Sequence, residues 1–305
     1  MINKKGMEFS WIFAVIIGIV ILFLAFYFVG SKITRQDTQE ATGTVNSLDI
    51  LFNPFSYLGA MGAVTSKPIG LSKESSFTFD CDSVDLGSNT ISLDTGVSRA
   101  VYDKYIFADN FRAKTIQTLS KSFEMPWRIA DLIYVFTGDY CFVNVPLDLE
   151  NELSKLEINN LQIAESLSEC QENSTIVCFG SSCQIKVVST SGNYYQGYVE
   201  KNGEDLYFSG DNYALLLGAI FSRDKAYYDC NVQRLAYRLG LEIQVYEKKK
   251  EELIQDGCVI NINLDTLKQV DAALKSRVNQ NSINGLYNEA KNIENLNYNS
   301  ECPLF

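Results

Sequence analysis

The sequence predicts an α+β protein that begins with a transmembrane helix. Three observations support this fold class. An uncharged apolar run fills residues 11–29, strand-like segments dominate residues 76–146 and 175–208, and helical periodicity prevails from residue 211 onward. Because the strands come first and the helices later, the body is expected to be α+β rather than a doubly wound parallel sheet.

The opening apolar run has the length of a membrane span. Trp11 to Val29 are 19 residues without a charge, roughly 28 Å as a helix, against roughly 30 Å for the hydrocarbon core. A cleaved secretory signal has a shorter apolar region and small residues at its cut site, whereas this run ends in bulky side chains. We therefore expect a short basic segment over 1–9 and a permanent anchor in the lipid bilayer over 10–30.

Cysteine usage indicates which side of the membrane the body occupies. Basic residues flank both ends of the span and give only a slight preference for a cytoplasmic N-terminus. All eight cysteines lie beyond the span, in an even number and without a C-x-x-C motif, which is typical of disulfides outside the cytosol. Cys178 and Cys183 flank a short turn and are an expected pair, and Asn173 begins a glycosylation sequon. The body is therefore expected to be extracytoplasmic; the alternative is free thiols in a reduced compartment.

The first residues carry a resemblance to a known family. Lys4-Lys5-Gly6 before a long apolar helix resembles the signal of archaeal type IV prepilins. This resemblance implies cleavage after Gly6, with Met7 as the new first residue, and packing of the helix into a filament core. Glu8 is similar to the acidic residue of mature pilins, although it would be second rather than fifth. The whole chain is similar to uncharacterised single-pass membrane proteins of small-genome archaea, which implies no activity.

A stalk and a connector are expected between the span and the body. Ala41, Val45, Leu48 and Phe52 recur at helical spacing and predict a helical stalk over 31–53, which Pro54 ends. The Gly-, Ser- and Ala-rich stretch 54–75 is expected to be a connector. The α+β ectodomain then covers 76–305, and a subdivision into 76–158 and 159–305 is one interpretation.

Turn residues predict three hairpins in the strand-rich region. Thr137-Gly138-Asp139 would join 132–136 to 140–145, Gly180 would join 175–178 to 184–188, and Asn202-Gly203 would join 195–201 to 205–208. A short helix is expected after Pro146, with Asp148 at its favourable N-terminal end.

Helical periodicity then predicts four C-terminal helices. An apolar helix is expected over 213–221, and Ser222 or Asp224 can cap the next one. That helix holds its apolar spacing over residues 228–246, the clearest periodicity in the body. Two further helices are indicated by apolar residues over 267–278 and 286–293.

The sequence offers few groups for catalysis. It contains no histidine, which excludes Ser-His-Asp and Cys-His nucleophiles and removes the commonest metal ligand. It also lacks the common nucleotide-binding motifs, and no cofactor is expected. Asp80 and Asp82 could act as paired carboxylates or bind a hard cation; a solvated strand end is the simpler interpretation. Four tyrosines lie close together in the sequence: Tyr194, Tyr195, Tyr198 and Tyr207. They form either a recognition surface or part of the core of a sheet.

Charge narrows the range of partners. The net charge is -11, and the first 35 residues hold four basic side chains and one acidic side chain. The rest of the chain is therefore more acidic still and repels phosphate backbones, which argues against a nucleic-acid partner. The sequence thus favours a membrane-anchored protein with a structural, adhesive or protein-interaction role at the cell surface, through a protein partner or self-assembly. The alternative is a membrane-tethered hydrolase that uses carboxylates.

Overall fold

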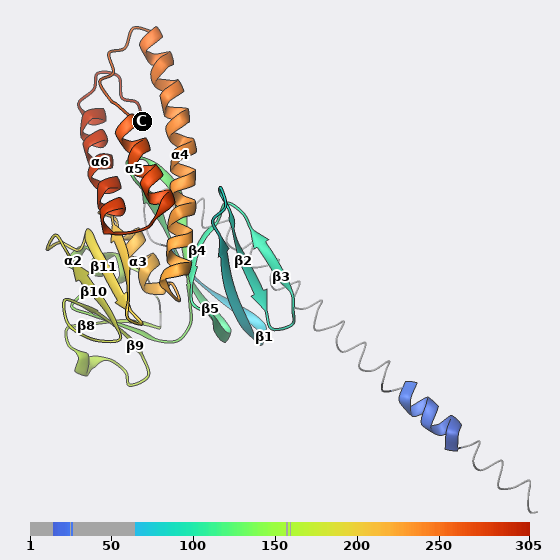
Figure 1. Cartoon of the computed structure of the whole chain (residues 1–305). Coiled ribbons are helices and arrows are strands. Elements are labelled where there is room, and N and C mark those ends of the chain that lie inside the picture. Colours follow the sequence, from blue (N-terminus) through green and yellow to red (C-terminus); the bar gives the residue numbers. More distant parts are fainter. Residues whose placement is uncertain (1–14, 25, 27–64, 157, 159) are drawn as a thin grey trace, which may run out of the picture.

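Two six-stranded sheets and a group of C-terminal helices make up the body (Figure 1). A computed structural model describes residues 15–24, 26, 65–156, 158 and 160–305. The order of strands first and helices later confirms the predicted α+β class. The expected stalk over 31–53 lies outside the described residues. Residues 15–24 are helical with exposed apolar side chains, and no helix among the described residues is both long and apolar enough to cross a membrane.

The first sheet, sheet A, begins earlier than the sequence suggests. Its first strand starts at Thr65, inside the stretch expected to be a connector, because residues 65–70 pair with 115–120 of a neighbouring strand before the register shifts between Gly70 and Ser75. The strand order is β3-β2-β1-β5-β6-β4, and only the β4–β6 pair is parallel. The strands are β1 Thr65–Asp82, β2 Ser88–Leu93, β3 Ser98–Val101, β4 Tyr105–Ala108, β5 Phe111–Glu124 and β6 Arg128–Phe136.

The second sheet, sheet B, has the order β12-β11-β10-β9-β7-β8. Its strands are β7 Tyr140–Val143, β8 Leu161–Ala164, β9 Thr175–Phe179, β10 Ile185–Ser189, β11 Gln196–Lys201 and β12 Glu204–Ser209. Strand β7 lies between β8 and β9. The boundary suggested at residue 158 therefore falls inside one sheet, and a single apolar core includes side chains from both sheets.

Two of the three expected hairpins are wrong. The turn at Gly138 does not pair its flanking strands, because β6 belongs to sheet A and β7 to sheet B. Strands β9 and β10 are adjacent but parallel, since the chain doubles back after Gly180 before it enters β10. The third hairpin forms: β11 and β12 are antiparallel, and Asn202 and Gly203 both have positive φ, 55° and 78°, as a tight hairpin turn requires.

A short helix lies between the two sheets. Helix α3 (Ala214–Phe221) has all eight residues buried and contacts β4, β5 and β6 on one side and β11 and β12 on the other. A helix that is apolar all round needs such an enclosed position. The buried Lys201 donates from Nζ to the carbonyls of Ile220 and Ser222, at 3.3 and 2.7 Å. Its positive charge complements the C-terminal end of the helix dipole.

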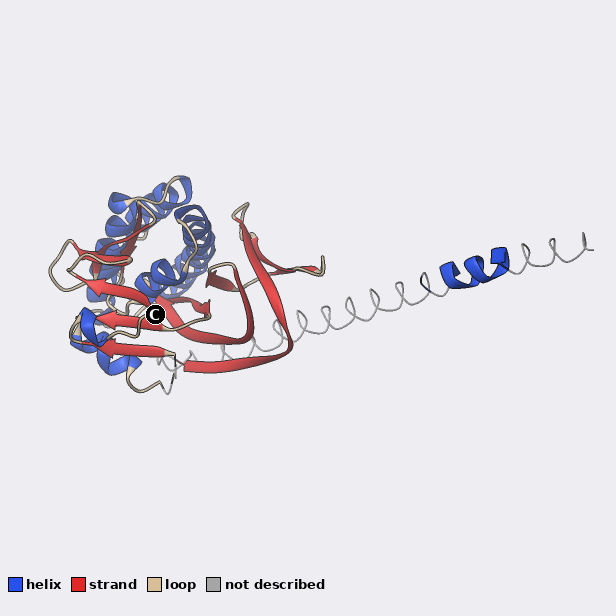
Figure 2. Ribbon diagram, turned by 90° about the horizontal axis from the view of Figure 1, so that it is seen from below, coloured by secondary structure: helices blue, strands red, loops and turns tan. Residues whose placement is uncertain are grey.

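The remaining helices are α2 (Leu147–Leu153), α4 (Lys225–Gln255), α5 (Asp265–Ser276) and α6 (Gln280–Tyr298). Asp224 caps α4 by accepting from the backbone N–H of Tyr227 at 2.8 Å. Helix α4 is about 46 Å long, and α5 and α6 stand beside the part of it that extends beyond the sheets (Figure 1). Figure 2 shows these helices grouped together, next to the long curved strands.

A buried acid lies where α4 and α5 approach closely. A Cβ at Gly240 would come within 2.2 Å of Lys275 Nζ and 2.8 Å of Asp271 Oδ2, so the glycine makes room for this ion pair. Asp271 is only 3% exposed, and its Oδ1 has no hydrogen-bond partner. Burial raises the pKa of Asp271, although Lys275 at 2.5 Å opposes the shift.

We predict that Asp271→Asn stabilises the protein at neutral pH. A carboxyl whose pKa is raised by folding favours the folded state while protonated, and that benefit is lost as the pH rises through the acid range. Because the raised pKa already includes the attraction of Lys275, the amide removes the net cost of ionising this buried group, on the order of 1 kcal/mol. The advantage should vanish at acidic pH, where the native carboxyl is protonated as well. Urea unfolding of both proteins at several pH values measures it, with the exposed Asp94→Asn as control. A variant that is less stable than the native protein at pH 7 would contradict the prediction.

We also predict that two disulfides differ in their contribution to stability. Cys81 and Cys230 are 149 residues apart, whereas Cys178 and Cys183 are five apart. A crosslink restricts the unfolded chain more when it closes a longer loop, by about 5 against about 2 kcal/mol for these separations. Guanidinium unfolding of the two double serine variants should therefore show the greater loss for Cys81→Ser/Cys230→Ser. Equal losses would argue against this chain-entropy account.

Candidate functional site

All eight cysteines are paired, which indicates an extracytoplasmic or secreted protein. The bonds are Cys81–Cys230, Cys141–Cys170, Cys178–Cys183 and Cys258–Cys302. The expected pair, Cys178 and Cys183, is among them. Cys141–Cys170 and Cys178–Cys183 share a small apolar cluster of their own in sheet B. The disulfides thus take the place of a larger core there.

The other residues singled out in the sequence are spread over the chain. Gly6, Met7 and Glu8, at the expected processing site, lie outside the described residues. Asn173 is exposed in the turn that precedes β9, so the sequon is accessible to a glycosylating enzyme.

The acid pair of β1 takes part in structural contacts. Asp80 has its side chain 59% exposed and lies 3.3 Å from Arg223, and Asp82 Oδ1 accepts from the backbone N–H of Val84 at 3.0 Å. Among the described residues no three Asp, Glu, Cys or His side chains are grouped so as to hold a metal ion. The pair therefore fits the simpler interpretation, a solvated strand end.

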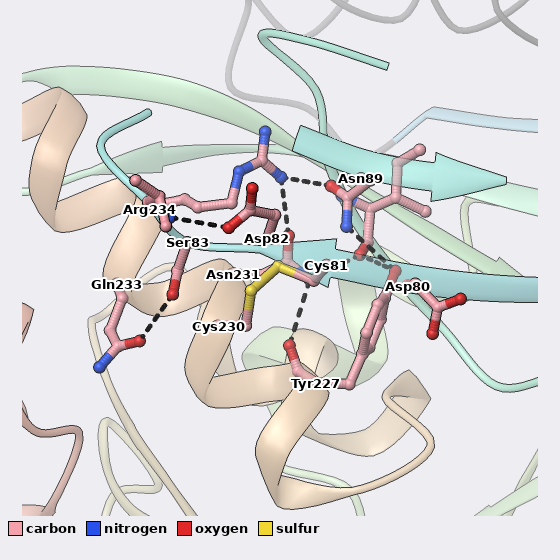
Figure 3. The surroundings of a disulfide bond; sticks show 12 residues. Asp80, Cys81, Asp82, Ser83, Asn89, Tyr227, Cys230, Asn231, Gln233 and Arg234 are labelled. Carbon is pink, nitrogen blue, oxygen red and sulfur yellow. Dashed lines mark hydrogen bonds between the residues drawn. A yellow bond between two sulfur atoms is a disulfide. The ribbon is translucent and has the colours of Figure 1, made fainter. Parts of the chain in front are cut away.

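The disulfide between Cys81 and Cys230 lies beside a buried polar network that closes the edge of sheet A (Figure 3). The edge strand β4 presents the backbone of Ile106 to this network. Its N–H donates to Asn89 Oδ1 at 3.1 Å. Its carbonyl accepts from Tyr227 Oη at 2.8 Å and from Asn231 Nδ2 at 3.0 Å. Helix α4 thus supplies side chains where a further strand would otherwise pair.

Arg234 completes this network as a buried cation. It donates from Nε to the carbonyl of Leu86 at 2.9 Å and from one terminal nitrogen to the amide oxygens of Asn89 and Asn231. Its guanidinium lies 4.9 Å from the centre of the Tyr105 ring. Burial lowers the pKa of Arg234. No ion pair among the described residues neutralises it, so amide, carbonyl and ring contacts hold the charge.

The four tyrosines noted in the sequence separate into different environments. Tyr198 and Tyr207 face each other across β11 and β12, with ring centres 6.0 Å apart. Tyr194 packs edge-on against Phe179 at 5.2 Å. Tyr195 contacts residues from other elements: its ring is 5.6 Å from that of Tyr213, and its hydroxyl donates to Asp148 Oδ2 at 3.3 Å.

Around Tyr195 lies a group that we term the tyrosine–acid cluster. Its members come from α2, from the segment before β11, from the β12–α3 connection and from α6. They are Asp148, Tyr195, Asp211, Tyr213, Tyr287 and Lys291. Sequence reasoning missed most of them, because no spacing links residues brought together from four separate segments. The only sequence signal was the local density of tyrosines near Tyr195.

The cluster and its immediate neighbours hold more acidic than basic side chains. Lys291 Nζ lies 2.6 Å from both Asp211 Oδ2 and Glu294 Oε2. Burial by itself would lower the pKa of Lys291, but its hydrogen bonds to Asp211 and Glu294 raise it overall. Burial raises the pKa of Tyr287, and neighbouring Asp211 raises it further against the effect of Lys291. These side chains are therefore close enough to interact, with acids in excess.

The backbone beside the cluster is unusual. Tyr213 is buried and has φ 58°, a left-handed conformation that non-glycine residues adopt at a cost and often near functional sites. Burial raises the pKa of Tyr213, and Tyr195 and Asp148 raise it further. Asn212 fixes the segment by donating from Nδ2 to the carbonyl of Ser122 at 2.8 Å.

An ion pair between a buried lysine and a half-exposed glutamate joins α2 to sheet A. Lys121 of β5 is 1% exposed, and its Nζ is 2.6 Å from Glu152 Oε2 on α2. Glu152 also raises the pKa of Tyr213 slightly, which places it near the cluster. The pair ties α2, and with it Asp148, to sheet A.

No family model, curated protein or solved structure matches the chain. The candidate site therefore rests on the geometry of the described residues.

We predict that Asn89→Ala destabilises the protein strongly. The change removes the acceptor for the Ile106 N–H and for Arg234, and both donors remain buried. Leaving such groups unpaired costs about 2–4 kcal/mol. Urea unfolding measures the loss, and the exposed Asn151→Ala on α2 is a matched control that should change stability little. A loss no greater than that of the control would show that the network is not needed for stability.

Proposed function

We propose that this is a single-pass membrane protein whose disulfide-stabilised body stands outside the cytoplasm and acts through protein contacts at the cell surface. The four disulfides support the compartment, and the uncharged run from Trp11 to Val29 supports the anchor in a lipid bilayer. The role is structural or adhesive, with a protein partner or a second copy of the chain.

The tyrosine–acid cluster is the observation that carries this proposal. Tyr195 and Tyr287 are half-buried, so each presents part of a ring to the surface while the rest of it is held in place. Tyrosine is enriched at protein interfaces, because its ring adds contact area and its hydroxyl forms hydrogen bonds. Polar groups from separate elements converge beside these rings, as they do in binding sites.

The hydrolase alternative finds less support. Asp80 is paired with Arg223, and Asp82 accepts from a backbone N–H of its own turn. Alanine replacement of both acids tests the alternative directly. A hydrolytic activity that disappears in this variant while the fold stays intact would replace the purely structural role.

We predict that the body of the protein lies on the outer side of the cell membrane and that it contains no free thiols. A membrane-impermeant protease added outside should digest the body, and all eight cysteines should react with a thiol reagent only after reduction, even in the unfolded protein. The measurement is the mass of labelled protein with and without reductant. Reaction of all eight cysteines without reductant, together with protection from the protease, would place the body in a reducing compartment and overturn the proposal.

The pilin-like form of this proposal adds cleavage after Gly6 and assembly through the apolar helix. Its test is the mass of the mature N-terminal peptide. A chain that starts at Met7 supports prepilin processing, and replacing Gly6 should then block it. An intact Met1 would leave a permanent anchor and exclude the filament role.

A further inference from the structure

We propose that the tyrosine–acid cluster binds a cationic side chain of a protein partner, and specifically an arginine. This inference rests on the proposed function, since it names the chemistry of the partner for the same surface. Three observations on the described residues carry it: the charge of the cluster, the position of its tyrosine rings, and the way in which the chain itself holds arginine.

The first observation is an excess of negative charge. Four carboxylates lie in or beside the cluster against two ammonium groups: Asp148, Glu152, Asp211 and Glu294 against Lys121 and Lys291. Lys121 is matched by Glu152, while Asp211 and Glu294 share Lys291. Asp148 is exposed and forms no ion pair among the described residues; its carboxylate accepts a hydrogen bond from the hydroxyl of Tyr195. A cationic side chain of a partner protein could therefore form an ion pair with the carboxylate of Asp148.

The second observation is that a half-buried tyrosine, Tyr195, lies beside this carboxylate. The hydroxyl of Tyr195 orients toward Asp148, and its ring is tilted by 52° to that of Tyr213. A cation over a tyrosine ring gains about 0.5–1 kcal/mol at an exposed site. A guanidinium suits such a place better than an ammonium, because its planar fork matches a carboxylate and its face stacks on a ring.

The third observation is that the chain holds its own cationic side chains, two arginines among them, in this way. Arg223 lies 5.0 Å from the centre of the Tyr227 ring while it bonds to Asp80 and Asp224. Arg234 lies 4.9 Å from the centre of the Tyr105 ring. Lys225 is held similarly, 5.4 Å from the centre of the Tyr207 ring and paired with Asp229, so tyrosine with carboxylate or amide oxygens accommodates cations in this protein. The preference for guanidinium over ammonium comes from its planar, bidentate shape. The tyrosine–acid cluster has the same groups and contains no arginine of its own.

Binding of a labelled hexa-arginine peptide to the full chain in neutral detergent micelles tests the proposal. We expect saturable binding that weakens with salt and is several-fold tighter than for hexa-lysine. Asp148→Asn, which removes a charge at an exposed position without changing size, should weaken binding about fivefold. Tyr195→Phe, which keeps the ring but frees Asp148, should weaken it about twofold. The controls are Asp94→Asn and Tyr298→Phe, an exposed acid and an exposed tyrosine elsewhere on the body, and neither should change binding.

Each other outcome overturns the proposal. Equal binding of the two peptides, or equal weakening by Asp94→Asn, would mean attraction by the acidic surface as a whole. Native-like binding by Asp148→Asn would exclude the cluster. Binding of a neutral chitin hexasaccharide that Tyr195→Phe weakens, without arginine preference, would assign the site to glycans instead. Because the titration uses purified protein, it is independent of the cell-surface protease test: a body found inside the cell would refute the proposed function and leave this measurement unchanged.

Discussion

The structure depends on finding partners for backbone groups that lie inside the protein. A buried N–H or carbonyl without a hydrogen bond is costly, and strand β4 is an edge strand that helix α4 covers. The pairing it lacks is supplied by Asn89 from β2 and by Tyr227 and Asn231 from α4, which bond to Ile106. Arg234 then fixes the amide oxygen of Asn89. The edge of sheet A is closed by side chains instead of by a strand.

A related constraint, that buried hydroxyl and ammonium groups also need hydrogen-bond partners, explains other buried polar residues around α3. Its first carbonyl, that of Ala214, accepts from Tyr134 of sheet A at 2.8 Å. The carbonyl of Leu215 accepts from Tyr228 of α4, which also bonds to the carbonyl of Tyr207 in sheet B. Lys201 of sheet B donates to the carbonyls of Ile220 and Ser222 at the C-terminal end of α3. Polar contacts from both sheets and from α4 therefore meet at one helix, and they specify how these elements fit around it.

Local signals in the sequence predicted individual helices and one tight turn correctly, but they did not predict which strands pair. The apolar spacing of α4, the Asn202-Gly203 turn and the acids after Pro146 each depend on neighbouring residues, and the structure contains those elements. Strands β6 and β7 look like a hairpin locally, but burial on different sheets separates them. Nothing in the spacing of cysteines indicates that Cys81 meets Cys230. The tyrosine–acid cluster could not be predicted from the sequence for the same reason, since its residues come from four separate segments.

These features together give the cluster a rigid frame. Asp148 lies on α2, which the Lys121–Glu152 ion pair joins to sheet A. Tyr213 begins α3 at the centre of the core. Lys291 joins α6 to Asp211 in the β12–α3 connection, and the Cys258–Cys302 disulfide holds the chain after α6 to the end of α4. Side chains fixed in this way lose little conformational entropy when they bind a ligand. A frame stabilised by disulfides and buried hydrogen bonds thus suits the binding role proposed above, because a preformed surface adds to affinity.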